Sequence, residues 1–161
     1  MSWLSRTVSL LTLLLMTLIL VYFWQWRGPV LDFACSSWFR QYNTGDDFDM
    51  ISNTLFTFTP DGKGLISMDG AVIHYGKTFK LRRDYSFTYK HIGGNKWQFL
   101  DVDMTQAGSD SVPSGLLERN FYSTENRSRG IFIYIAQVWD IPGAWTVGGL
   151  YSPAFMCVDN G

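Results

Sequence analysis

The two cysteines are the residues whose type and spacing most directly suggest chemistry. Cys35 and Cys157 lie near opposite ends of the region that follows an apolar amino-terminal run. A disulfide between them would close a large loop, which is reasonable for a domain outside the cytosol. The alternative is a pair of buried free thiols, since free cysteine is often buried. We predict the disulfide.

Other residues that could do chemistry are few. His74 and His91 each lie near the end of a predicted strand, where they are either surface histidines or groups that could gain a proton in an acidified compartment. Asp101 and Asp103 alternate along a strand and could form an acid–base pair, although a solvated sheet face is more common. The sequence has no phosphate-binding loop, dinucleotide fingerprint, zinc-type histidine pair or nucleophile elbow. We therefore expect no catalytic residue, no metal and no cofactor, and the protein is not expected to be an enzyme.

Arg83 is a charged residue on an apolar face. Leu81, Tyr85, Phe87 and Tyr89 share its parity along the predicted strand 78–90. A buried arginine needs a carboxylate or carbonyl partner, whereas one at the mouth of a barrel could meet an anionic ligand. Structural pairing is the more common outcome, and contact with a ligand or partner remains the alternative.

The stretch 131–139 is apolar on both faces of a predicted strand. One face packs in the core, and the other needs a helix, a membrane surface or a protein partner unless the core covers both. The residues that we predict as possible partner or ligand contacts are Arg83, Ile131, Ile133, Ile135 and Trp139.

The pattern of hydrophobic residues along the chain is mostly the alternation that is typical of β-strands. Turns at 59–63 and 93–95 predict consecutive hairpins and hence an antiparallel meander. Seven or eight short strands in one domain must curl or close. We expect a mainly β (β-rich α+β) fold, either a curved antiparallel sheet or a partial lipocalin-like barrel. The predicted strands are 55–59, 65–73, 78–90, 97–105, 131–138, 145–150, 154–158 and the more ambiguous 33–42, with a helical turn or two at 116–121.

An almost unbroken apolar run from Val8 to Val21, extended by aromatic residues to Trp26, precedes this domain. The run is long enough to cross a bilayer and lacks the small residues of a signal-peptide cleavage site. We expect a short cytoplasmic tail at 1–7, a transmembrane helix at 8–26 and a periplasmic β-rich domain at 27–161. Arg6 and Arg27 nearly balance across the membrane, so this single-pass orientation in a bacterial inner membrane depends on the predicted disulfide.

The charge of the domain argues against binding to nucleic acid. Arg6 and Arg27 account for two of the thirteen basic residues, so eleven face fourteen acidic residues beyond Arg27 and leave a formal charge of −3. A nucleic-acid-binding domain would carry a basic patch instead.

The sequence resembles the FidL-like membrane proteins of enterobacteria over most of its length. The resemblance is carried by the amino-terminal anchor, by glycines and aromatic residues, and by the cysteines: Cys35, the turn Pro60-Asp61-Gly62-Lys63-Gly64, Asp69-Gly70, Leu81-Arg82-Arg83 and Phe155-Met156-Cys157. That family is associated with ToxR-like membrane-bound transcription regulators, much as ToxS accompanies ToxR.

The resemblance implies an accessory protein that binds the periplasmic sensor domain of a ToxR-like, single-pass regulator and stabilises or modulates it. The ToxR-type pairs also suggest a bile-salt-like or fatty-acid-like ligand between the subunits. The alternatives are a stand-alone periplasmic binder of an apolar small molecule and an envelope-assembly factor.

Overall fold

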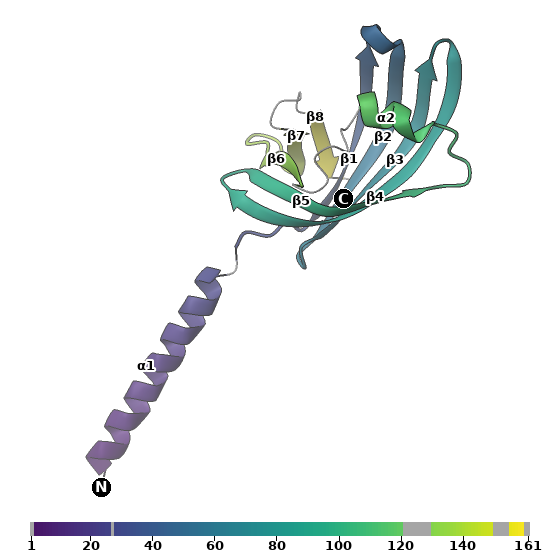
Figure 1. Ribbon diagram of the computed structural model, residues 1–161. Helices are drawn as coiled ribbons and strands as arrows, with labels where there is room; N and C mark the ends of the chain where they lie inside the picture. The colour runs from purple at the N-terminus through teal and green to yellow at the C-terminus, as the bar shows by residue number, and fades with distance from the viewer. Residues whose placement is uncertain (1, 27, 121–129, 150–154, 160–161) are drawn as a thin grey trace.

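A closed antiparallel barrel is the main body of the protein (Figure 1). The computed structural model describes residues 2–26, 28–120, 130–149 and 155–159, with side chains described for 8–22 in the first range. Its elements are α1 (Ser2–Trp26), β1 (Phe33–Asn43), the 3-10 turn η1 (Thr44–Asp46), β2 (Phe48–Thr59), β3 (Lys63–His74), β4 (Lys77–Gly93), β5 (Lys96–Gln106), α2 (Ser114–Asn120), β6 (Ile131–Gln137), β7 (Ala144–Gly149) and β8 (Phe155–Asp159).

The mainly β class and the antiparallel meander are confirmed, but the barrel is closed rather than partial. Each strand pairs with the next, and β8 returns to pair with β1. Closure removes the two exposed edges that an open sheet would leave. The ambiguous segment 33–42 is a strand. Leu150 and Ala154, at the ends of the predicted strands 145–150 and 154–158, lie outside the described residues.

The tight turns follow from residues that tolerate a left-handed backbone. Gly62 has φ 83° in the β2–β3 turn, and Gly94 has φ 56° in the β4–β5 turn. A side chain on Cβ disfavours these angles, so glycine is the natural residue at both points. The β4–β5 turn joins the two strands that place Phe87 against Phe99, with ring centroids 4.0 Å apart.

The strands differ greatly in length, which divides the barrel into two ends. β1 to β5 are long, whereas β6 to β8 are short and line only one end. That end, which holds Phe33 and the β2–β3 and β4–β5 turns, is called the proximal end because α1 joins the barrel there. The opposite end, with η1 and the β3–β4 turn, is called the distal end, and α2 lies across it (Figure 1).

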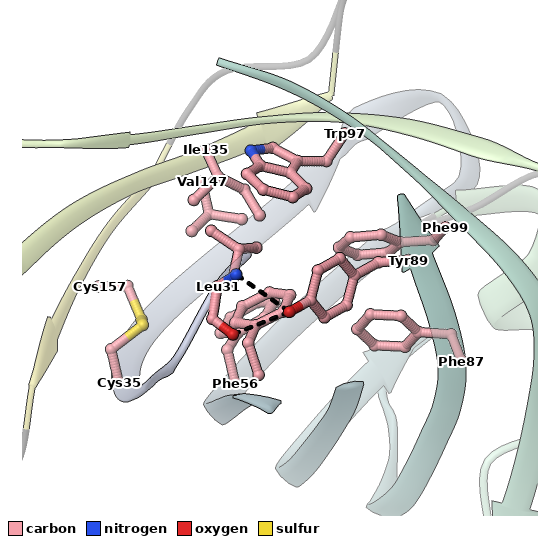
Figure 2. Packing of buried hydrophobic residues seen from close by; sticks show 11 residues of the cluster. Leu31, Cys35, Phe56, Phe87, Tyr89, Trp97, Phe99, Ile135, Val147 and Cys157 are labelled. Atoms are coloured by element: carbon pink, nitrogen blue, oxygen red, sulfur yellow. Dashed lines mark hydrogen bonds between the residues drawn. A yellow bond between two sulfur atoms is a disulfide. The ribbon is translucent and has the colours of Figure 1, made fainter. Parts of the chain in front are cut away.

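Each end has its own apolar core. The proximal core fills the barrel with aromatic side chains and includes the disulfide (Figure 2). Within it, the Tyr89 hydroxyl donates to the carbonyl of Leu31 and accepts from the Leu31 N–H, at 2.8 and 3.0 Å. The distal core lies between the long strands and α2, and its buried residues are Phe48, Met50, Met68, Val72, Leu81, Tyr85, Val112, Leu116 and Leu117.

Gly70 allows β3 to approach β2 closely. A Cβ at this position would lie 2.1 Å from the carbonyl oxygen of Ile51, which is backbone and cannot rotate away. We expect Gly70→Ala to lower the free energy of unfolding by about 2–3 kcal/mol, the upper range for overpacking. Chemical denaturation would measure this. Gly108→Ala is the matched control, since a Cβ there meets nothing within 4 Å, and equal stability of the two variants would contradict the prediction.

α1 is a helix that extends away from the barrel (Figure 1). Its large apolar side chains from Val8 to Tyr22 are all exposed, with between 46% and 69% of their surface accessible. Among the residues whose side chains are described, no helix combines the length and the apolarity needed to cross a membrane. The side chains of 23–26, which belong to the predicted aromatic boundary, lie outside that set.

Candidate functional site

Arg83 forms a buried ion pair with Asp110 beside the distal core. The guanidinium donates from Nε to Asp110 Oδ2 at 3.0 Å and from Nη2 to Oδ1 at 3.2 Å, and neither side chain is exposed. Nη2 also donates to the carbonyl oxygen of Val112. The structural pairing that the sequence favoured is therefore what the structure shows for Arg83.

Asp110 holds the segment after β5 against β4. Its carboxylate accepts five hydrogen bonds, two of them from Arg83 and the others from the Arg82 N–H, the Val112 N–H and Gln106 Nε2. Burial alone would raise the pKa of Asp110, but the donors from Arg83, Arg82 and Val112 outweigh it, so the pKa is lowered. Burial opposes the charge of Arg83 as well, and the Asp110 carboxylate reverses this and raises its pKa.

One nitrogen of Arg83 remains without a partner. Nη1 is buried and has no hydrogen bond to any described residue. Arg83 lies in the same register row as Met68, Thr54 and Ser37, and the last two are buried hydroxyl residues. Polar side chains therefore lie where the two cores meet, although the cores stay in contact through Ile66 and Val102, which pack against both. Arg83 Nη1 is a buried N–H donor at this point that could serve an acceptor.

The structure places the predicted isoleucines in the barrel rather than on its surface. Ile135 is buried in the proximal core, and Ile131 and Ile133 pack against that core. Ile135 is therefore buried, whereas Ile131 and Ile133 are half-buried, and the prediction that these residues contact a partner or a ligand stays a prediction. Their neighbours Phe132 and Tyr134 occupy the outer face instead, because side chains alternate along a strand.

Phe132 and Tyr134 belong to a broad outer surface without charged side chains. The outward positions of β6, β7 and β8, together with 34–38 of β1 and 51–57 of β2, contain no Asp, Glu, Lys or Arg. We call this surface the charge-free wall. Its large exposed residues are Trp38, Leu55, Phe132, Tyr134, Met156 and Val158.

The strand register makes the charge-free wall continuous. Tyr134 pairs with Gly148 across β6 and β7, and Thr146 pairs with Met156 across β7 and β8. Ser36 then pairs with Val158 on one side and with Leu55 on the other. The outer faces of β3 to β5 differ sharply, because they carry charged residues such as Lys80, Arg82, Asp84 and Lys90.

Trp38 is the most prominent residue of the charge-free wall, with 73% of its surface exposed. Apolar side chains that are scattered singly over a surface need no explanation, whereas a contiguous patch marks an interaction site. The sequence contained a signal for it, since Trp38 has the opposite parity to Cys35, which a disulfide would place inside. Trp38, Met156 and Asp110 were not among the contact residues predicted from the sequence.

Trp139 lies apart from the charge-free wall, in the loop between β6 and β7, and 96% of its surface is exposed. Of the five predicted contact residues it is the one that the structure places fully at the surface.

The predicted disulfide between Cys35 and Cys157 is present and joins β1 to β8 (Figure 2). The position of the disulfide matters for the stability of the barrel, because the β1–β8 pairing between described residues is short. Cys35 pairs with Asp159 and Ser36 with Val158, and no other β1–β8 pair occurs between described residues. The covalent bond therefore reinforces the strand contact that has the fewest residue pairs among the described residues.

The remaining candidates do not come together as a reactive site. His74 lies at the distal end, with its Nε2 3.7 Å from Asp46, whereas His91 lies at the proximal end against Trp97. Asp101 and Asp103 are exposed. No three His, Cys, Asp or Glu side chains are grouped as metal ligands within the part of the chain that the structure describes.

Comparison with known proteins adds no identification. Neither the known family models nor the curated proteins include a match to this chain.

Proposed function

We propose that this protein is a membrane-anchored periplasmic accessory protein. Its barrel would bind the sensor domain of a ToxR-like, single-pass transcription regulator and stabilise or modulate it. The charge-free wall is the observation that supports this proposal. Centres of protein interfaces are depleted of charge and enriched in aromatic residues and methionine, as the charge-free wall is.

The proposed location in the bacterial inner membrane has two supports. A disulfide persists in an oxidising compartment such as the periplasm. The exposed apolar side chains of α1 are suited to contact with lipid. In this arrangement residues 1–7 are cytoplasmic, residues 8–26 of α1 are the anchor and the domain from 27 to 161 is periplasmic.

Site-specific photocrosslinking of the full-length protein, expressed at its native level, tests the proposed partner. A benzophenone amino acid would replace Trp38 or Met156 on the charge-free wall, and Lys80 on the charged side would serve as the control. Capture of a membrane-bound regulator through its periplasmic domain from positions 38 and 156, and not from 80, is the expected result. The absence of such a regulator from both wall positions would overturn the proposal.

Trp38→Ala should weaken the captured complex without unfolding the barrel. An exposed tryptophan at the centre of an interface commonly contributes 2 kcal/mol or more, so we expect affinity to fall by roughly thirtyfold. Titration of the purified full-length pair would measure this. Thr88→Ala, on the opposite side of the barrel, should leave the affinity unchanged, and an equal loss in both variants would contradict a specific interface.

A second candidate function is the binding of an apolar ligand that carries an acidic group, in the manner of a fatty acid or bile salt. The observation in its favour is the buried Nη1 of Arg83, which has no hydrogen bond to any residue that the structure describes. Mass spectrometry of organic extracts from the purified protein distinguishes the two functions. A retained amphiphilic acid in a monomeric protein that captures no regulator would make the ligand binder the better account.

A further inference from the structure

We infer that the proximal end of the barrel makes a second, direct contact with the bilayer surface, beyond the anchor itself. The contact consists of Val30, Ile92, Trp139 and Ile141, which we call the proximal rim. This inference rests on the proposed anchoring by α1. It adds that the barrel is oriented against the membrane rather than suspended on a free tether.

The strand register brings the proximal rim to the end of the barrel where α1 joins. Lys96, at the start of β5, pairs with Tyr134, so the chain beyond Gln137 extends past the β4–β5 turn. The β6–β7 loop is tied to the end of β8, where the Asp159 N–H donates to the Gly143 carbonyl at 2.7 Å.

The residues of the proximal rim are unusually exposed for their types. Trp139 exposes 96% of its surface and Val30 57%, while Ile141 and Ile92 expose 45% and 42%. Tryptophan places its ring at the boundary between lipid headgroups and acyl chains, because the ring is apolar and its N–H is polar. A cluster of this composition is suited to the bilayer surface.

The β6–β7 loop is built to hold Trp139 and Ile141 outward. The Val138 N–H donates to the Ala144 carbonyl at 2.8 Å, and the Ala144 N–H donates to the Ile141 carbonyl at 3.1 Å. Gly143 adopts φ 74°, which closes the turn. Because these hydrogen bonds hold the turn in place, the exposure of its apolar side chains is a feature of its conformation.

The short connection between α1 and the barrel is the reason to expect that the proximal rim contacts the bilayer. Leu31 is fixed to the barrel by its two hydrogen bonds with the Tyr89 hydroxyl. Four residues separate it from Trp26, the last residue of α1, so the Cα atoms of Trp26 and Leu31 lie at most about 18 Å apart even when the chain is fully extended. If α1 ends at the headgroup layer, the proximal rim lies within reach of that layer.

Charges near the proximal rim have both signs. Lys90 and Lys96 lie on the β4–β5 hairpin, and Asp61, Asp140 and Asp159 lie on neighbouring turns and strand ends. A mixed surface has no net attraction for anionic headgroups. We therefore expect the contact to form on phosphatidylcholine and to change little when phosphatidylglycerol is added.

Photocrosslinking to lipid tests the inference with the full-length protein in phosphatidylcholine vesicles. A benzophenone amino acid would replace Trp139 in one variant. The matched control is Tyr75, an aromatic residue that is 67% exposed at the distal end. A third variant, at Leu14 in α1, reports on the anchor. All three positions are exposed, and unchanged thermal unfolding would show that the variants fold.

Lipid adducts at 139 and 14, with roughly tenfold less at 75, are the expected result. Adducts at 14 alone would overturn the proximal rim and leave the anchor intact. Adducts at none of the positions would overturn both. Equal adducts at 139 and 75, or adducts of 139 to protein rather than lipid, would also overturn the inference, since they would show no preferred orientation or a different occupant.

Discussion

Replacing both cysteines, as Cys35→Ala with Cys157→Ala, is expected to lower the free energy of unfolding by about 4–5 kcal/mol. The disulfide links residues 122 positions apart, so it removes a large amount of conformational freedom from the unfolded chain. Small domains are stable by only about 5–15 kcal/mol in total. The double variant should therefore be close to unfolded at 37 °C.

The place of the disulfide gives a second reason for a large effect. It lies at the β1–β8 seam, where the pairing between described residues is limited to Cys35 with Asp159 and Ser36 with Val158. Without the covalent bond, the short β8 can separate from β1 and leave two unpaired strand edges, which favour aggregation.

Urea denaturation of the purified protein, with and without a reductant, would measure the effect. Cys35→Ser alone should release one titratable thiol at Cys157. A double variant whose midpoint and slope match those of the unsubstituted protein would contradict the prediction.

Asp110→Asn is expected to destabilise the protein by about 3–5 kcal/mol, the usual cost of breaking a buried ion pair. The substitution keeps the shape of the side chain but leaves the Arg83 guanidinium buried without a counter-charge. The Arg82 and Val112 N–H groups would also lose a charged acceptor. Since Asp110 anchors the segment that leads into α2, hydrogen exchange should increase in α2 first.

The double variant Arg83→Met with Asp110→Leu is the informative control. It removes both charges and fills the space with apolar atoms, which is often neutral or stabilising at buried ion pairs. We expect it to be more stable than Asp110→Asn. A double variant as unstable as the single one would show that the charge pairing is not the cause of the loss.

The pair also predicts an acid dependence with a definite sign. The folded-state pKa of Asp110 is lowered below its ordinary value of 3.8, so its contribution is fully present above about pH 4. The contribution is lost as the pH falls from there toward the folded-state pKa. The free energy of unfolding, measured between about pH 5 and pH 2, should therefore fall less steeply with falling pH in Asp110→Asn than in the unsubstituted protein. Parallel curves for the two proteins would contradict the assignment to Asp110.

The sequence by itself determined most strands, the turns and the inward position of Arg83. The exception is β2, which was predicted only over 55–59 but begins at Phe48. The correctly predicted features are local properties, because alternation of apolar residues and the backbone freedom of Gly62 or Gly94 depend on a few neighbours. The cysteine pair was predictable as well, since a long loop outside the cytosol favours a disulfide. Most strand boundaries could therefore be predicted from local sequence patterns.

β5 contains a bulge where it pairs with β4. Only the tertiary structure decided which way the side chains of β5 point beyond this bulge. Trp97 and Phe99 point inward at odd positions, whereas Val102 and Met104 pack inward at even ones. The register shifts between Ser86 and Thr88 of β4, and Asp101 has φ 51°. A bulge adds one residue on one strand and reverses the parity beyond it, which periodicity alone does not reveal.

The closure of the barrel and the partner of Arg83 also depended on contacts between distant residues. Asp110 lies 27 residues after Arg83 in an irregular segment, where no local pattern distinguishes it from other aspartates. Closure placed Ile131, Ile133 and Ile135 inside and left Phe132 and Tyr134 on the charge-free wall. A strand that is apolar on both faces does not say which face is inward, because that choice is made by the strands that it pairs with.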